Sequence, residues 1–381
     1  MQQRSRNHTR TIAIVAAGLA LVAAGGGTVV AQDAPEVIRT VEGVTIQGPW
    51  YRYDTEQCTF VEVPEADAPT EYISELKKMD GTTLVYTPEG QTAEFDTTLN
   101  AGVEQAAKDA GMEWFQLSNE YPDTDLPITN ADQAITVEAD VIISGNVLSD
   151  LYPQIQAKYE EACIPFLNQF AVPGTVNVPR FQADNYVTGA VEAEAAAKII
   201  TARGWPVAEL RIVTCTDPAI TTEPGTVYDI NRGFRETLVE LLGASPDQIE
   251  ATDLVCTYEL GAEKARQAMA DWLTANPDVT YVVGTTHIDD VYSLGLSNAL
   301  RDAGFGENAL VVGRGGGSAW LELMATGDPI AAVSGNPDFP AWGDPIVAMA
   351  QDIAMGKPVP SLVSPPVAAV TAENVADYLP Q

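Results

Sequence analysis

Two adjacent carboxylates, Asp289 and Asp290, stand in a polar loop that also carries His287. Such side chains accept hydrogen bonds from hydroxyl groups or pair with a cation. Adjacent carboxylates point apart, which favours hydrogen bonding and helix capping over paired acid–base catalysis. We therefore expect Asp289 to face a ligand and Asp290 to be the N-cap of the helix that follows. His287 is either a ligand contact or a cap that faces solvent.

A second polar loop, residues 313–317, has the sequence GRGGG and carries Arg314. A dinucleotide-binding loop would have glycine at the sixth position, where this chain has Ser318, and an acid placed for the ribose, which is missing. The sequence therefore disfavours a nucleotide, although an anion at the N-terminus of the next helix remains open. Arg314 would pair with a ligand anion or with Asp289.

These loops belong to a repeating pattern of short apolar strands and amphipathic helices. Strands are predicted at 83–86, 113–117, 139–144, 164–167, 210–215, 251–257, 279–283, 309–312 and 330–334. Helices are predicted between them, and the pattern occurs as two series. This alternation predicts an α/β fold with two doubly wound parallel-sheet lobes. Because ligands of such folds bind outside the carboxyl ends of the strands, the loops should converge on one site.

The composition excludes some partners. The chain has 53 acids against 20 Lys and Arg, a formal net charge of −33. Nucleic acids and anionic membranes are polyanions and would be repelled by this surface. We therefore expect no nucleic-acid partner, and we interpret the acidity mainly as a means of keeping an exported protein soluble.

Residues 1–31 have the pattern of a signal peptide, with a basic start, an apolar stretch and small residues at 29–31. An uncleaved membrane anchor is the alternative, because the apolar stretch approaches spanning length. No cysteine follows it closely, so we expect a periplasmic protein that is not lipid-anchored.

The four cysteines are even in number and lack C-x-x-C spacing, which disfavours zinc and redox motifs. We expect Cys215 to pair with Cys256, since both end predicted strands. Cys58 would then pair with Cys163. Other connectivities and free thiols remain open.

The order of several motifs resembles the periplasmic sugar-binding proteins of ABC transporters, the ribose/galactose type among type I periplasmic binding proteins. The motifs are Phe95 to Gly111, Ile164-Pro165, Ala183-Asp184-Asn185 with Gly189, Gly233-Phe234, Asp289-Asp290 with Gly295, Gly313, and Asn336-Pro337 with Gly343. The resemblance covers about residues 81–381. No one of them is decisive, and their order and spacing carry the resemblance.

The resemblance implies two lobes joined by three crossings that close on one ligand. The N-terminal lobe would comprise residues 81–183 and 335–360, and the C-terminal lobe residues 184–334 and 361–381. Residues 32–80 would be an extension packed on the first lobe. The hinge crossings would lie near Asp184, Gly335 and Pro360. The implied partners are a small solute and the permease subunits of an ABC transporter, with the protein a monomer and no cofactor or metal.

When the family's ligand-contact positions are compared with this sequence one by one, some are matched and others are not. Phe95 falls at the family's stacking aromatic, Tyr258 near a second one, and Asp289 at the family's Asn. The polar residues that bracket a sugar in the family, most of them charged, are replaced here by Phe170 and Ala171, Ile230, Gly315 and Gly335. Gln169, Phe170, Tyr228, His287 and Arg314 are the further candidates for ligand contact. We expect a sugar, polyol or related compound, neutral or cationic because of the two adjacent acids.

Two other classes of function compete with solute transport. A sensor protein could present the same fold to a membrane receptor or kinase. An enzyme is disfavoured, because the chain has two histidines in all, one of them in the signal segment, and no G-x-S-x-G motif. Ligand-dependent stabilisation without turnover would distinguish a binding protein from an enzyme.

Overall fold

The computed structural model builds residues 35–381 around two mainly parallel β-sheets. The described residues are 37–41, 44–69, 72, 74–121, 123–146, 148–170, 178–218, 220–221, 225–256, 261–286, 288–336 and 338–379. The expected signal segment, residues 1–31, lies outside them. Within the described ranges, no helix combines the length and the apolar character that crossing a membrane would require.

Among the described residues, the first sheet contains nine strands, and four of its parallel strands lie where the sequence predicts them. Its order is β1 (Val37–Val41), β2 (Val44–Asp54), β14 (Val359–Ser364), β8 (Arg180–Phe181), β7 (Phe166–Gln169), β6 (Val141–Gly145), β4 (Thr83–Thr87) and β5 (Glu113–Gln116), with β3 (Thr59–Glu62) on β2. The strands from β14 to β5 run parallel, whereas β1, β2 and β3 pair antiparallel. The largely apolar β6 is buried along its whole length, as expected of a strand covered on both faces.

The second sheet has six strands. Its order is β10 (Glu250–Val255), β9 (Leu210–Thr216), β11 (Tyr281–Thr286), β12 (Ala309–Arg314), β13 (Ala331–Asn336) and β15 (Ala368–Thr371). All neighbours are parallel except β13 and β15. The fold is therefore α/β with two mainly parallel sheets, each forming a lobe, as the sequence predicted.

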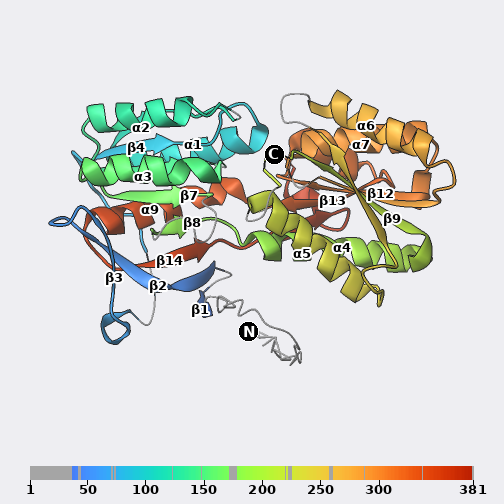
Figure 1. Cartoon of the computed structure of the whole chain (residues 1–381), viewed down its shortest axis with the longest axis horizontal. Helices are drawn as coiled ribbons and strands as arrows, with labels where there is room; N and C mark the ends of the chain where they lie inside the picture. Colours follow the sequence, from blue (N-terminus) through green and yellow to red (C-terminus); the bar gives the residue numbers. More distant parts are fainter. Residues whose placement is uncertain are drawn as a thin grey trace, which may run out of the picture. The chain divides into compact units, whose positions relative to one another are not determined.

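Helices cover both faces of each sheet and enclose the apolar cores. The helices are α1 (Glu94–Asp109), α2 (Leu126–Thr136), α3 (Tyr152–Glu161), α4 (Asn185–Arg203), α5 (Thr226–Leu241), α6 (Gly261–Ala275), α7 (Asp290–Asp302), α8 (Ser318–Ala325) and α9 (Gly343–Ala354). In the second lobe, α4 and α5 pack together on one side of the sheet and α6 and α7 on the other (Figure 1). One core surrounds the first sheet, and two cores lie on the faces of the second.

Two glycines set the position of α5. A Cβ on Gly189 of α4 would overlap the carbonyl oxygen of Ile230, and one on Gly233 would overlap that of Tyr186. The absence of side chains there lets the backbones of α4 and α5 approach closely. The N-terminal turn of α5 is thereby held where it can contribute Thr226 and Ile230 to a cavity.

The N-terminal extension continues the first sheet. Its strand β2 pairs with β14, and Tyr51, Tyr53 and Phe60 are buried in the core of the first lobe. The Cys58–Cys163 disulfide fastens the β2–β3 turn to the segment that follows α3. The segment leading to β4 is held at the buried Asp352 of α9, which accepts hydrogen bonds from Ser74 at 2.8 Å and Lys77 at 3.2 Å.

The chain passes between the two sheets at three places. The first is near Asp184, which follows β8 and caps α4, its side chain accepting a hydrogen bond from the Val187 N–H. The second follows β13, whose penultimate residue is Gly335. The third lies at 365–367, between β14 and β15. Pro360 is thus not at a crossing: it pairs with Trp50 inside β14, because this strand belongs entirely to the first sheet.

The four cysteines form the two pairs that we preferred from the sequence, Cys58–Cys163 and Cys215–Cys256. We expect Ellman's reagent to find no free thiol in the denatured, unreduced protein, whereas four thiols would contradict both bonds.

Replacing Cys58 and Cys163 by serine frees a loop whose ends are 105 residues apart in the sequence. The free energy of unfolding in urea should fall by about 2–5 kcal/mol.

Candidate functional site

A cavity of about 80 Å³ lies where loops from both sheets meet. Glu89 follows β4, Glu120 and Tyr121 follow β5, and Phe170 follows β7. From the second sheet, the loops after β9, β11 and β12 contribute. Each of these residues lies beyond the carboxyl end of a strand, as the open α/β architecture predicts. The lining residues are Glu89, Gly90, Thr92, Phe95, Asp96, Glu120, Tyr121, Phe170, Ile220, Thr226, Val227, Ile230, Ile288, Arg314, Gly315 and Phe339.

Aromatic rings form much of the apolar wall. Phe95, in the first turn of α1, packs against Phe339 with ring centroids 5.4 Å apart. Phe170 also lines the cavity and has a φ of 64°, an uncommon conformation for a bulky side chain. Aromatic faces pack well against the C–H faces of a small polyhydroxy compound.

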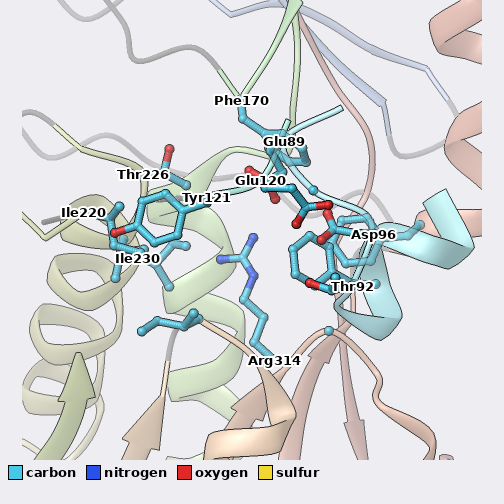
Figure 2. Close-up of a pocket in the computed structure, with 16 residues that line it drawn as sticks. Glu89, Thr92, Asp96, Glu120, Tyr121, Phe170, Ile220, Thr226, Ile230 and Arg314 are labelled. Atoms are coloured by element: carbon cyan, nitrogen blue, oxygen red, sulfur yellow. The ribbon is translucent and has the colours of Figure 1, made fainter. Parts of the chain in front are cut away.

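Arg314 projects its guanidinium into the cavity between Tyr121 and Asp96 (Figure 2). It is the last residue of β12 and only 8% exposed. Burial lowers its pKa, and the charges of Glu192 and Glu89 oppose this effect. Its Nη1 atom is buried without a hydrogen-bond partner in the described structure. A ligand oxygen would satisfy this donor.

Three carboxylates, those of Glu89, Asp96 and Glu120, face the same cavity (Figure 2). Burial raises the pKa of Asp96 to about 7, and the charges of Asp289 and Glu120 add to the rise. Burial also raises the pKa of Glu89 well above its usual range, with a further rise from Asp96 and an opposing effect of Arg314. Glu89 Oε2 and Asp96 Oδ2 are buried without partners among the described residues.

The roles that we assigned to Asp289 and Asp290 need correction. The N-cap of α7 is Asp289, whose Oδ1 accepts a hydrogen bond from the Val291 N–H at 2.7 Å. Asp290 is the first residue of the helix, and it is 1% exposed. Its Oδ2 accepts hydrogen bonds from the Gly317 N–H at 2.9 Å and the Ser334 hydroxyl at 2.7 Å. The residue expected to cap its own helix therefore holds the loop around Arg314 instead.

Of the other predicted contact residues, Phe95, Phe170 and Arg314 line the cavity. Gln169, Tyr228 and Asp289 are not among the described residues that line it. The Gln169 Oε1 instead accepts a hydrogen bond from the Tyr86 hydroxyl at 2.9 Å. In α5, the neighbours Thr226, Val227 and Ile230 face the cavity in place of Tyr228. Tyr258 and His287 lie outside the described residues.

Sequence reasoning did not single out the acids of the first lobe. Glu89 and Glu120 lie in the loops after strands β4 and β5. Their position beyond the carboxyl ends of strands could have identified them as candidate ligand contacts. Asp96 lies directly after Phe95, on the same first turn of α1. Glu192, buried in α4 and close enough to Arg314 to affect its pKa, had no local signal, because its placement depends on how α4 packs.

Two sets of hydrogen bonds join the lobes beside the cavity. Glu94, in the first turn of α1, accepts from the Ser318 N–H at 3.1 Å and from the Ser318 hydroxyl at 3.2 Å. Ser318 begins α8, and a carboxylate at a helix N-terminus is stabilised by the helix dipole. The Tyr121 hydroxyl donates to Asp217 at 3.3 Å. These bonds tie loops of the first sheet to loops of the second.

The geometry defines a two-lobed α/β protein with a polar and aromatic cavity at the carboxyl ends of both sheets. Residues 84–358 match the periplasmic binding protein domain family. The chain belongs to this family, and its fold is that of type I periplasmic binding proteins. No curated protein matches it significantly.

Solved structures show the same fold at low sequence identity. A solute-binding protein of an ABC transporter from Actinobacillus succinogenes, with bound D-allose, is 17% identical with a TM-score of 0.66 and covers 78% of this chain and 100% of its own. A solute-binding protein from Mycobacterium smegmatis, with bound glycerol, is 21% identical and has a TM-score of 0.66. The match covers 79% of this chain and 97% of that protein. A solute-binding protein from Bacillus halodurans, with bound myo-inositol, is 18% identical and has a TM-score of 0.63. The match covers 78% of this chain and 97% of that protein.

Stability should fall as pH rises from about 5 to about 8. Burial raises the pKa of Asp289 to about 6, of Asp96 to about 7 and of Asp290 to about 8. The folded state therefore holds protons that the unfolded chain, with aspartate pKa values of about 4, has released. Asp328 and Asp352 have lowered pKa values, so their contribution is lost only in more acidic solution. Melting temperatures across this range test the sign, and Asp96→Asn should flatten the slope. A protein most stable at about pH 8 would contradict the assignment.

Asp290→Ala should lower the free energy of unfolding by about 1–3 kcal/mol, because the Gly317 N–H and the Ser334 hydroxyl lose their acceptor. Asp290→Asn is the matched control: it keeps an acceptor oxygen and should cost less. Asp289→Ala removes a cap and should cost about 1 kcal/mol. Urea unfolding compares the three variants, and equal losses in both Asp290 variants would refute the hydrogen-bonding role.

Proposed function

We propose that the protein is an extracytoplasmic solute-binding protein of an ABC importer, and that it captures a small polyhydroxy solute in the cavity between its lobes. The observation that supports this most is the pairing of aromatic walls, Phe95 and Phe339, with buried polar atoms that lack partners. Within the described part of the chain, Arg314 Nη1 is a donor without an acceptor and Asp96 Oδ2 an acceptor without a donor. A ligand with hydroxyl groups on an apolar ring or chain would satisfy both requirements.

The ligands of the similar structures support this solute class. D-allose, myo-inositol and glycerol differ in size and ring type, and they share hydroxyl groups on neighbouring carbons. Sequence identity to these proteins is low, and the charged set here is this chain's own. We therefore propose for this chain the class of solute that these proteins bind, and not any one of their ligands.

The proposed cycle is closure of the two lobes by bending at the three crossings, near Asp184, after Gly335 and at 365–367. Each crossing is short, so a few backbone angles can absorb the change. The hydrogen bonds from Ser318 to Glu94 and from Tyr121 to Asp217 would form on closure and favour the closed state. The loaded monomer would then dock on the permease subunits.

The proposed location is the periplasm. The two disulfides fit an oxidising compartment, because thiols stay reduced in the cytosol. Membership of the periplasmic binding protein family also supports an extracytoplasmic site.

A thermal-shift screen of aldoses, inositols, alditols, glycerol, amino sugars and amino alditols tests the proposal. A ligand that is present at about 100 times its Kd should stabilise the protein by about 2.7 kcal/mol. The hit should disappear in Phe95→Leu and persist in Glu113→Gln, which changes an exposed carboxylate of β5 outside the cavity. Mass spectrometry should recover the ligand unchanged. Consumption of the ligand, or no shift with any compound, would overturn the proposal.

A further inference from the structure

The charges that line the cavity are out of balance. Among the described lining residues, three carboxylates, Glu89, Asp96 and Glu120, face one guanidinium, that of Arg314. Asp289 adds a further negative charge that acts on Asp96. Asp96 is 2% exposed, and its Oδ2 has no hydrogen-bond partner among the described residues. Displacing water from such a group costs free energy unless a positive charge or a donor replaces it.

The walls next to these carboxylates suit an organic cation. Phe95 precedes Asp96 on α1 and packs with Phe339, and both rings line the cavity. The faces of aromatic rings attract ammonium groups within about 6 Å. A metal ion, by contrast, would need a shell of oxygen ligands, which phenyl rings cannot supply. The juxtaposition of rings and unpaired carboxylate therefore favours an alkylammonium group.

Resting on the proposed function, we infer that the solute is a polyhydroxylated amine, such as an amino sugar or an amino alditol. Its ammonium group lies among Glu89, Asp96 and Glu120, and a hydroxyl or ring oxygen at its other end accepts a hydrogen bond from Arg314 Nη1. The ammonium group supplies donors to Glu89 Oε2 and Asp96 Oδ2, which have no hydrogen-bond partner in the described part of the chain. The acids thus select the charge, and the guanidinium orients the ligand.

A neutral sugar is the rival, and it predicts the opposite dependence on pH. Burial raises the pKa of Asp96 to about 7, so its carboxyl group could instead be protonated and donate to a sugar hydroxyl. Glu89, Glu120 and Asp289 face Asp96 with like charge, and Arg314 acts on Glu89 with opposite charge. Binding of an amine requires Asp96 and Glu89 to lose their protons, so it should weaken as pH falls. Binding of a neutral sugar to protonated carboxyls should strengthen.

Isothermal titration calorimetry with matched pairs of probes separates the two. The pairs are 1-amino-1-deoxy-D-glucitol against D-glucitol, and D-glucosamine against D-glucose, with N-acetyl-D-glucosamine as an uncharged amide. At about pH 7.5 we expect at least one amine to bind about tenfold more tightly than its neutral partner. Its affinity should fall as pH is lowered to about 5. Equal or tighter binding of the neutral partners, or binding of no amine, would overturn the inference. A shift with any neutral compound in the thermal screen would still leave the proposed function standing.

Variants tie the selectivity to the cavity. Asp96→Asn keeps the size of the side chain and removes its charge, so the ratio of amine to alditol affinity should fall by about tenfold or more. Glu113→Gln removes one carboxylate on β5, outside the cavity lining, and should leave the ratio unchanged. Circular dichroism checks that both variants are folded, and Glu120→Gln provides a second test should Asp96→Asn fail to fold. An unchanged ratio in the folded cavity variant would contradict the placement of the ammonium group.

Discussion

The charge of Arg314, buried among carboxylates, is the constraint around which the site is built. Its guanidinium is nearly inaccessible, and Glu89, Glu192 and Asp290 surround it with negative charge. An ionised group without compensation in such surroundings would be costly, so the cation and the acids depend on one another. The local excess of acids is left for a ligand to neutralise, and this connects the stability of the site to its proposed selectivity.

Helix N-termini hold the loops that carry these charges. Asp289 caps α7, Asp290 binds the loop before α8, and Glu94 of α1 receives the N–H group of Ser318 at the start of α8. Helix N-termini leave N–H groups without partners inside the helix, and these acids accept hydrogen bonds from such groups. The same contacts fix Arg314 and join loops of the two sheets.

The N-terminal extension packs on the first lobe, away from the cavity. Strand β2 pairs with β14, the last strand before the third crossing, and Cys58–Cys163 fastens the extension to the segment after α3. The similar structures cover about 78% of this chain and nearly all of their own, so roughly a fifth of the chain has no counterpart in them. The extension therefore holds one edge of the strand that leads into the third crossing.

The sequence by itself determined the alternation of strands and helices, the two parallel sheets and the convergence of loops at their carboxyl ends, because hydrophobic periodicity and glycine stops are local signals. It also identified Phe95, Phe170 and Arg314 as candidate ligand contacts, because they lie beside strand ends or family motifs, and all three line the cavity. The tertiary structure alone decided that Asp289 caps and Asp290 binds a neighbouring loop, since which oxygen meets which N–H depends on packing at a distance. It also brought Asp96, Glu89 and Glu120 into one cavity with Arg314. Residues from separate loops share a site only when the folded chain places those loops side by side.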